Sequence, residues 1–258
     1  MNKIIAIGGG EIGRPGTKIE TLLIDKEIIK LTKKKNPRLL FIPTASGDST
    51  SYVEIFNNYF GKKLKCHTGV LFLINKRYSR KYLEKIILNV DMIYVGGGNT
   101  LNMMNVWRKN KINEILKKAT EKGIVLSGVS AGANCWFDYG YAGRPVGSNK
   151  KLFNLKKVKG LGFIKGSFCP HYDFDKYRKI KLKKILKNKK EKVLAIDNGA
   201  AIEILENKYK IISANESSNA HLVFYEENKY IEKKIAKDKW LDLKDLFNTK
   251  ITKKYVNK

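Results

Sequence analysis

The chain has 258 residues, which is enough for one large α/β domain or two small ones with a full hydrophobic core. No apolar run approaches the roughly 18 residues of a membrane span, and Ile4 to Ile7 is too short for a signal peptide. The net charge of +28 comes from lysines spread along the whole chain, so we interpret it as solvated surface rather than a nucleic-acid site.

Strand and helix patterns alternate through the first half of the chain. Short apolar runs predict buried strands, and apolar residues spaced three or four apart predict helices between them. The predicted strands are 3–7, 38–42, 70–74, 92–95 and 124–126, and the helical faces lie at 24–31, 52–59, 83–87 and 104–116. This alternation is typical of a mostly parallel sheet covered by helices on both faces, a three-layer α/β/α arrangement. The glycine clusters at 8–10, 96–98 and 128–132 should then meet at the edge where the strands end.

The second half of the chain is less regular. Residues 139–160 are rich in Gly, Lys and Asn and are expected to form loops or a small excursion, and a strand at 162–169 and a basic helix follow. Further strands are predicted at 193–196, 200–205, 210–213, 221–225 and 230–235, the last four of them short and antiparallel. Residues 240–247 fit either a docking helix or a tail. Because no linker or internal repeat interrupts the chain, we predict a single domain spanning 1–258.

The segment that follows the strand at 124–126 matches the pattern G-x-S-x-G. Gly128 and Gly132 flank Ser130, and a helix of small residues starts directly afterwards. A serine on such a strand-to-helix turn is held in a strained conformation that exposes its hydroxyl, and a Cβ on either side would clash. The helix N-terminus also offers N–H groups to a developing oxyanion. The pattern therefore predicts a nucleophile, and the alternative is a glycine-rich turn whose serine caps a helix.

The glycines at 8–13 match the dinucleotide pattern G-x-G-x-x-G, but their context argues against a nucleotide site. Such a site needs an acidic residue at the end of the second strand, and here that strand ends in Phe41, Ile42 and Pro43. Pro15 also interrupts the helix that would hold the pyrophosphate. We therefore predict no organic cofactor.

His171 is the candidate general base, because it follows Pro170 at a predicted strand end where an imidazole could reach the seryl hydroxyl. Asp197 also ends a strand and could orient that imidazole. The competing acids are Asp138, Asp173 and Asp175, and the other histidines, His67 and His221, are interpreted as structural.

Three cysteines, Cys66, Cys135 and Cys169, are too few and too scattered for a disulfide framework, which favours a reducing compartment and a cytoplasmic location. Cys135 and Cys169 could bind a metal with His171, but no fourth ligand is evident, so no metal is expected.

Four motifs together resemble peptidase family S51, the dipeptidase E-like serine peptidases with a class I glutamine amidotransferase-like fold. The resemblance rests on segments that follow the family's order and span most of the chain: Gly96–Thr100, Gly128–Ala133, Cys169–Asp173 and Leu194–Gly199. The resemblance implies that Ser130 is the nucleophile, His171 the base and Asp197 the third triad member.

The same resemblance implies an oxyanion hole made by the backbone amides of Gly98 and Ala131, with Asn99 and Arg178 as candidate substrate-binding residues. In aspartyl dipeptidases of this family an arginine after the catalytic histidine binds the substrate's N-terminal aspartate. Arg178 occupies a comparable place, although the loop before it is shorter, and the alternative is an exposed helix arginine.

These observations predict a cytoplasmic serine peptidase that acts on short peptides through an acyl-enzyme, without metal or organic cofactor. A preference for N-terminal aspartate is one option, no membrane partner is expected, and either a monomer or a homodimer is compatible with the sequence. Two alternatives remain: a cyanophycinase-like hydrolase of β-aspartyl-arginine peptides, and a non-enzymatic, basic nucleic-acid-binding protein whose binding would depend steeply on salt.

Overall fold

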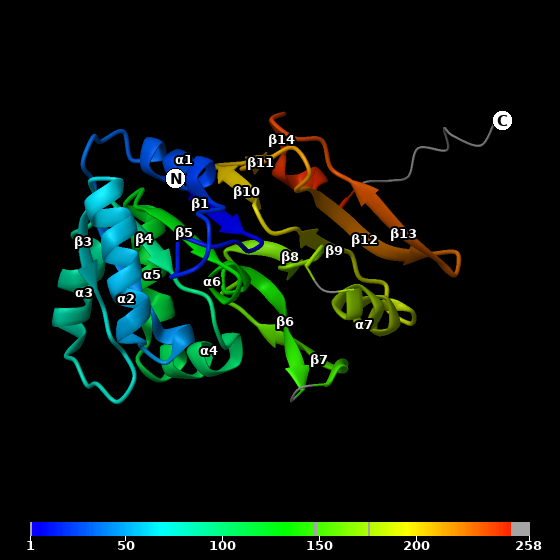
Figure 1. Ribbon diagram of the computed structural model, residues 1–258, viewed down its shortest axis with the longest axis horizontal. Coiled ribbons are helices and arrows are strands. Elements are labelled where there is room, and N and C mark those ends of the chain that lie inside the picture. The colour runs from blue at the N-terminus through cyan, green and yellow to red at the C-terminus, as the bar shows by residue number, and fades with distance from the viewer. Residues whose placement is uncertain (1, 147–148, 175, 249–258) are drawn as a thin grey trace.

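A computed structural model describes residues 2–146, 149–174 and 176–248 of the chain. Within these residues the strands form two sheets. The first has the order β14-β11-β10-β1-β5-β4-β2-β3, and the second β13-β12-β9-β8-β6-β7. The two sheets lie next to each other along the long axis of the molecule (Figure 1).

The first sheet has a parallel part and an antiparallel part. The parallel strands are β1 (Lys3–Ile7), β2 (Arg38–Ile42), β3 (His67–Val70), β4 (Met92–Val95) and β5 (Val125–Val129). The antiparallel extension consists of β10 (Ala200–Leu205), β11 (Lys208–Ser213) and β14 (Leu241–Asp242). This arrangement confirms the predicted α/β class with a mostly parallel core and short antiparallel strands near the C-terminus.

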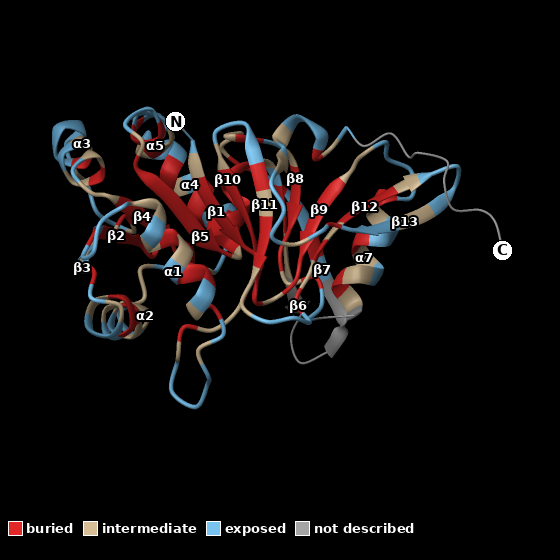
Figure 2. Cartoon of the chain, turned by 90° about the horizontal axis from the view of Figure 1, so that it is seen from above, coloured by how far each residue is buried: buried red, intermediate tan, exposed pale blue. Residues whose placement is uncertain are grey.

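Helices cover both faces of the parallel part (Figure 2). One layer contains α1 (Leu22–Leu31), α2 (Thr50–Phe56) and the continuing π-helix η2 (Asn57–Lys63), and the other contains α3 (Arg80–Leu88), α4 (Thr100–Lys109) and α5 (Ile112–Glu121). Successive strand residues point to opposite faces, so Ile5 and Ile7 join the core under α1 and α2. Ile4 and Ala6 join the core under the other helices. This explains why β1 is apolar at every position from Ile4 to Ile7.

The second sheet is built from the less regular half of the chain. Its strands are β6 (Phe137–Val146), β7 (Asn149–Lys159), β8 (Ile164–Cys169), β9 (Val193–Ile196), β12 (Ala220–Glu226) and β13 (Lys229–Lys234). Helix α7 (Lys176–Leu186) covers one face, and its Leu182 and Leu186 are fully buried against this sheet. Strands β6, β8 and β9 are parallel, so their ends also lie at a common edge.

The structure differs from the predicted elements in two strand regions. Residues 139–160 were expected to be loops, yet β6 and β7 form an antiparallel hairpin; residues 147–148 lie outside the described part. Few of the side chains described in this hairpin are apolar and buried, which hides its strand character in the sequence. The predicted strand at 70–74 lies instead at 67–70. Beyond it, the Asp48 carboxylate accepts the N–H groups of Leu73 and Ile74 at 2.6 Å each, so these groups do not pair with a neighbouring strand.

Two further segments also differ from the expectation. The helix expected through 104–116 is divided into α4 and α5 at Lys111, which adopts a left-handed conformation with φ of 53°. The segment 240–247 forms the short strand β14 and a single 3₁₀ turn, η3 (Leu243–Asp245). Across the described ranges no helix is both long and apolar enough to cross a membrane.

Candidate active site

The predicted nucleophile lies on a sharp turn between β5 and the short helix α6 (Ala131–Asn134). Ser130 has φ of 56° and ψ of −108°, a conformation that residues with a side chain rarely adopt, and its N–H donates to Ile7 O at 3.0 Å. A Cβ on Gly128 would collide with the backbone of Gly132, and one on Gly132 would collide with the backbone of Val95. Both glycines of the G-x-S-x-G pattern are therefore required by close packing of backbone against backbone.

His171 lies opposite this turn and contacts the serine directly. Its Nε2 is 2.7 Å from Ser130 Oγ, and its Nδ1 is 2.7 Å from Asn198 Oδ1. Since the Asn198 oxygen can only accept a hydrogen bond, Nδ1 carries the proton, and Nε2 is left as the acceptor for the seryl hydroxyl. The Ser130 hydroxyl, the neutral His171 imidazole and the Asn198 amide thus form a continuous chain of hydrogen bonds.

The glycine cluster at 8–10 passes directly beneath this pair. Gly8 O accepts the N–H of His171 at 3.0 Å, and Gly9 O accepts the N–H of Gly199 at 2.9 Å. A Cβ on Gly9 would overlap both the Asn198 oxygen and the His171 ring. The glycines that match a dinucleotide pattern therefore serve close approach of the backbone to the histidine and asparagine.

Asp197, the predicted third triad member, does not contact His171. Its side chain is 4% exposed and turns the other way, where Oδ2 accepts the N–H of Asn219 at 2.9 Å and lies 3.8 Å from His221 Nε2. Consecutive residues at the end of a strand direct their side chains to opposite sides, so Asn198 and not Asp197 reaches the imidazole. In the structure, the residue that contacts the imidazole is therefore Asn198, the neighbour of Asp197 in the same motif.

The other candidate acids have different partners. Asp173 Oδ1 accepts the N–H of Asn198 at 2.8 Å and so helps to hold the orienting residue. Asp138 Oδ2 accepts the N–H of Gly166 at 3.0 Å on the second sheet. Asp175 lies outside the described residues.

The surroundings of His171 keep its ring neutral. Burial lowers the pKa of His171 to about 4, and the nearby positive charge of Arg178 contributes in the same direction. The hydrogen bond to Asn198 and the negative charge of Glu11 oppose the shift without cancelling it. At neutral pH the imidazole is therefore in the unprotonated form that a general base requires.

The two predicted oxyanion donors lie beside the serine. Gly98 has φ of 142° in the turn between β4 and α4, and a Cβ there would overlap the Ala45 backbone. Its neighbour Gly97 lies so close to Ser130 that an added Cβ would be 3.6 Å from the serine Cβ. Ala131 is the first residue of α6, where backbone N–H groups lack partners within the helix.

The two predicted substrate-binding residues have structural contacts. Arg178 is 5% exposed, and its Nη2 donates to Gly143 O at 3.0 Å, so it is not the exposed helix arginine that was the alternative. The described residues that line the cavity next to Ser130 do not include Arg178. Asn99 caps helix α4, where its Oδ1 accepts the N–H of Asn102 at 3.1 Å.

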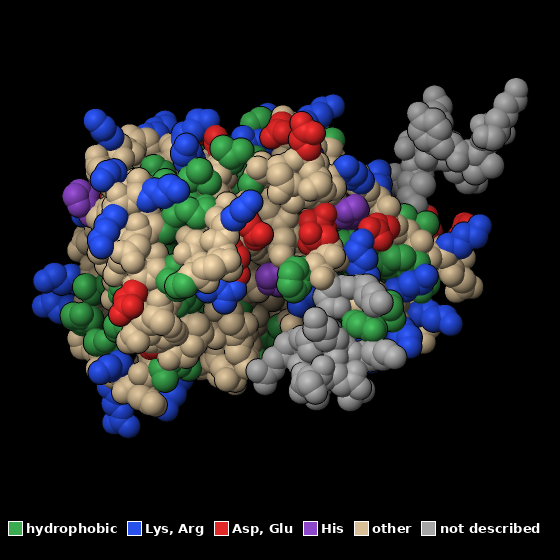
Figure 3. Space-filling model, in the orientation of Figure 1, with side chains coloured by type: hydrophobic (Ala, Val, Ile, Leu, Met, Phe, Trp, Pro, Cys, Tyr) green, Lys and Arg blue, Asp and Glu red, His purple; other side chains and the backbone are tan. Residues whose placement is uncertain are grey.

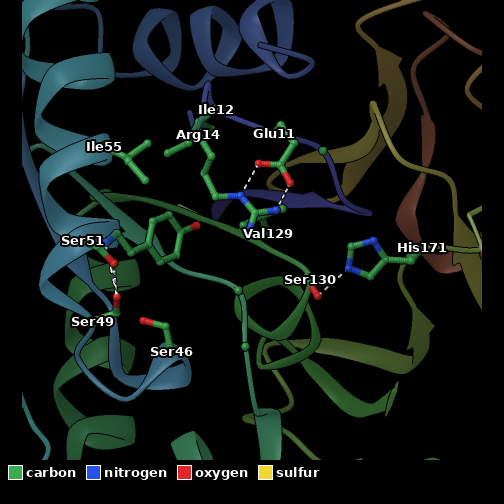
Figure 4. A pocket seen from close by; sticks show the side chains of 14 residues that line it. Glu11, Ile12, Arg14, Ser46, Ser49, Ser51, Ile55, Val129, Ser130 and His171 are labelled. Atoms are coloured by element: carbon green, nitrogen blue, oxygen red, sulfur yellow. Dashed lines mark hydrogen bonds and ion pairs between the residues drawn. The ribbon is translucent and has the colours of Figure 1, made fainter. Parts of the chain in front are cut away.

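A cavity of about 440 Å³ opens next to Ser130 and His171 (Figure 4). Its other walls carry the side chains of Glu11, Arg14, Ser46, Ser49, Ser51, Tyr52 and Ile55. In the face shown in Figure 3, a histidine and several acidic side chains lie around a central hollow, and lysines and arginines are scattered over the rest of the face. Glu11, Arg14 and Asn198 were not predicted from the sequence. Glu11 and Asn198 lie within the motifs at 8–13 and 194–199, and Arg14 directly follows the first of these.

The chain is similar in sequence to known peptidases. The model of "Peptidase family S51" matches residues 4–212. "Uncharacterized peptidase YgaJ" of Bacillus subtilis (strain 168) is 35% identical over 234 residues, which cover 90% of this chain and 96% of that protein. "Uncharacterized peptidase Lmo0363" of Listeria monocytogenes serovar 1/2a is 29% identical over 170 residues, which cover 64% of this chain and 80% of that protein.

Solved structures share the fold at low sequence identity. A peptidase from an acI-B1 Actinobacterium has a TM-score of 0.68 and 17% identity and covers 94% of this chain and 97% of its own. A "Putative Peptidase E Protein from Listeria monocytogenes EGD-e" has a TM-score of 0.60 and 20% identity and covers 83% of this chain and 98% of its own. Both agree with a class I glutamine amidotransferase-like α/β fold for this chain.

Proposed function

The chain belongs to peptidase family S51 and is a peptidase, and from this premise we propose that it hydrolyses short peptides with Ser130 as the nucleophile. The observation that carries the proposal is the continuous contact from Ser130 Oγ through the two ring nitrogens of His171 to Asn198 Oδ1, each step 2.7 Å long. The strained backbone at Ser130 supports it, because such strain persists at positions where an exposed nucleophile is needed.

In the proposed reaction, His171 Nε2 removes the hydroxyl proton of Ser130 while Oγ forms a bond to the peptide carbonyl carbon. The carbonyl oxygen becomes an oxyanion, which the N–H groups of Gly98 and Ala131 stabilise. When the tetrahedral intermediate collapses, the C–N bond breaks and Nε2 returns the proton to the leaving amine. Water, activated by the same nitrogen, then hydrolyses the acyl-enzyme and regenerates the serine.

Asn198 acts in this proposal as the residue that selects the tautomer of His171. An amide oxygen holds Nδ1–H as a carboxylate would, and an asparagine is known to serve this purpose in cysteine peptidases with a Cys-His-Asn arrangement. It lacks the negative charge that would stabilise the imidazolium, which is consistent with the low pKa of about 4 of His171.

A preference for N-terminal aspartate has less support than the serine mechanism. The arginine expected to bind an aspartate side chain, Arg178, is buried and donates to the Gly143 carbonyl. We therefore propose short peptides as the substrate class and make aspartate one member of the test panel.

The test is hydrolysis of a dipeptide panel by the wild type and by Ser130→Ala, with Ser213→Ala as the control. Ser213 ends β11 and does not line the cavity next to Ser130, so its loss should leave turnover largely unchanged. We expect Ser130→Ala to lose at least a thousandfold in kcat, and a fluorophosphonate to label the wild type at Ser130. Undiminished hydrolysis by Ser130→Ala would refute the mechanism. Selective cleavage of β-aspartyl-arginine peptides would instead support the cyanophycinase-like alternative.

A further inference from the structure

One wall of the cavity beside Ser130 is formed by the loop between β1 and α1, and this loop carries an ion pair. Arg14 Nε donates to Glu11 Oε2 at 2.7 Å, and Arg14 Nη2 contacts the other carboxylate oxygen. In Figure 4 this pair lies above Val129, with Ser130 and His171 to its right. The two-point contact fixes the orientation of the Glu11 carboxylate.

The backbone of the loop is also held in place. Glu11 N–H donates to Glu20 Oε2 at 3.0 Å, and the Glu20 N–H donates to Glu11 O at 2.7 Å. Ile12 and Ile19 form an antiparallel bridge across the loop. The Glu11 carboxylate is therefore preorganised at the edge of the catalytic cavity and does not swing freely in solvent.

Glu11 is the only carboxylate among the described residues that line this cavity. A carboxylate has about four lone-pair sites, and the two contacts with Arg14 leave sites on both oxygens for another donor. Its negative charge also reaches the catalytic centre, since it opposes the lowering of the His171 pKa. The cavity thus presents, beside its nucleophile, a carboxylate that is paired with Arg14 and keeps acceptor sites for a further donor.

We propose that Glu11 binds the free α-ammonium group of the substrate, so that Ser130 cleaves after the first residue of a short peptide. This inference rests on the proposed function. In the first residue of a peptide a single carbon separates the ammonium from the scissile carbonyl, so the ammonium partner must share the cavity of the nucleophile, as Glu11 does. Cleavage farther along a longer peptide would leave Glu11 without an ammonium partner, so the inferred site favours cleavage after the first residue.

The same wall indicates which first residues fit. Arg14 carries the only guanidinium among the described residues that line the cavity, and this guanidinium is already paired with the Glu11 carboxylate. A substrate aspartate would have to compete with Glu11 for this cation, whereas Tyr52, Ile55 and the three serines suit an uncharged side chain. The inferred substrates are short peptides with a free amino terminus and a neutral first residue.

The experiment compares each peptide with its N-acetylated form, for example Met-Ala and Ser-Ala, in the wild type, Glu11→Gln and Glu20→Gln. Glu20 belongs to the same loop, does not line this cavity, and its glutamine keeps an oxygen for the Glu11 N–H. We expect the wild type to favour the free peptide by tenfold to a hundredfold or so in kcat/KM, as for a charged hydrogen bond. Glu11→Gln should lose most of this preference, while Glu20→Gln keeps it.

Binding to the Ser130→Ala variant, measured by calorimetry, separates this inference from the proposed function. Tighter binding of free than of acetylated peptides, lost when Glu11→Gln is added, would support Glu11 as the ammonium site even without turnover. Equal binding of both forms, or no binding of either, would overturn it. If the wild type cleaves free and acetylated peptides equally, the serine mechanism stands and the role of Glu11 is refuted.

Discussion

Replacing Asn198 by alanine tests the contact that distinguishes this site from the one expected from the sequence. The variant removes the acceptor 2.7 Å from His171 Nδ1, so the imidazole can adopt the wrong tautomer and its charged form loses a hydrogen bond in the transition state. A hydrogen bond to a charged group contributes about 1.5–3 kcal/mol, so kcat/KM should fall by roughly 10- to 150-fold. The fold should survive, because Asn198 N–H still donates to Asp173.

The pH dependence of kcat/KM gives an independent test of the contact between Asn198 and His171. The wild type should lose activity only as the pH falls through about 4, where His171 becomes protonated. Asn198→Asp places a negative charge beside Nδ1, which raises the pKa of His171 and moves the acid limb of kcat/KM to higher pH. Asp197→Asn serves as the control, because it keeps the acceptor for the Asn219 N–H and lies away from the ring. If Asn198→Ala keeps full activity while Asp197→Asn is inactive, the geometric assignment is wrong.

Three further predictions concern residues that hold the active site or the rest of the fold in place. Gly9→Ala should reduce kcat at least a hundredfold without loss of the folded circular dichroism spectrum, since its Cβ would displace the Asn198 oxygen and the His171 ring. Asp48→Ala should lower the free energy of unfolding in urea by about 2–3 kcal/mol, because two backbone N–H groups past β3 lose a charged acceptor. Burial raises the pKa of Asp25 to about 7, so the native state binds this proton more tightly than the unfolded state. As the pH rises from about 4 to 7, the wild type should therefore lose up to about 4 kcal/mol of stability relative to Asp25→Asn; a constant difference would contradict this.

Buried parallel strands and the β6–β7 hairpin differ in how far local sequence predicts them. Strands β1, β2, β4 and β9 were predicted to the residue, because buried parallel strands read as continuous apolar runs. The hairpin of β6 and β7 has no such run, and its pairing across the second sheet could not be inferred from composition.

The glycine-flanked turn at Ser130 and the position of His171 after a strand could be predicted from the sequence, because a turn's backbone requirements and a strand's apolar pattern are local properties. The contact of Asn198 rather than Asp197 with the imidazole depends on the tertiary structure, since the direction of a side chain depends on how its strand is rotated within the sheet. The burial of Arg178 and the place of the Glu11–Arg14 pair in the cavity wall depend on it as well. Distances between segments far apart in the chain depend on packing, and no spacing within one segment encodes them.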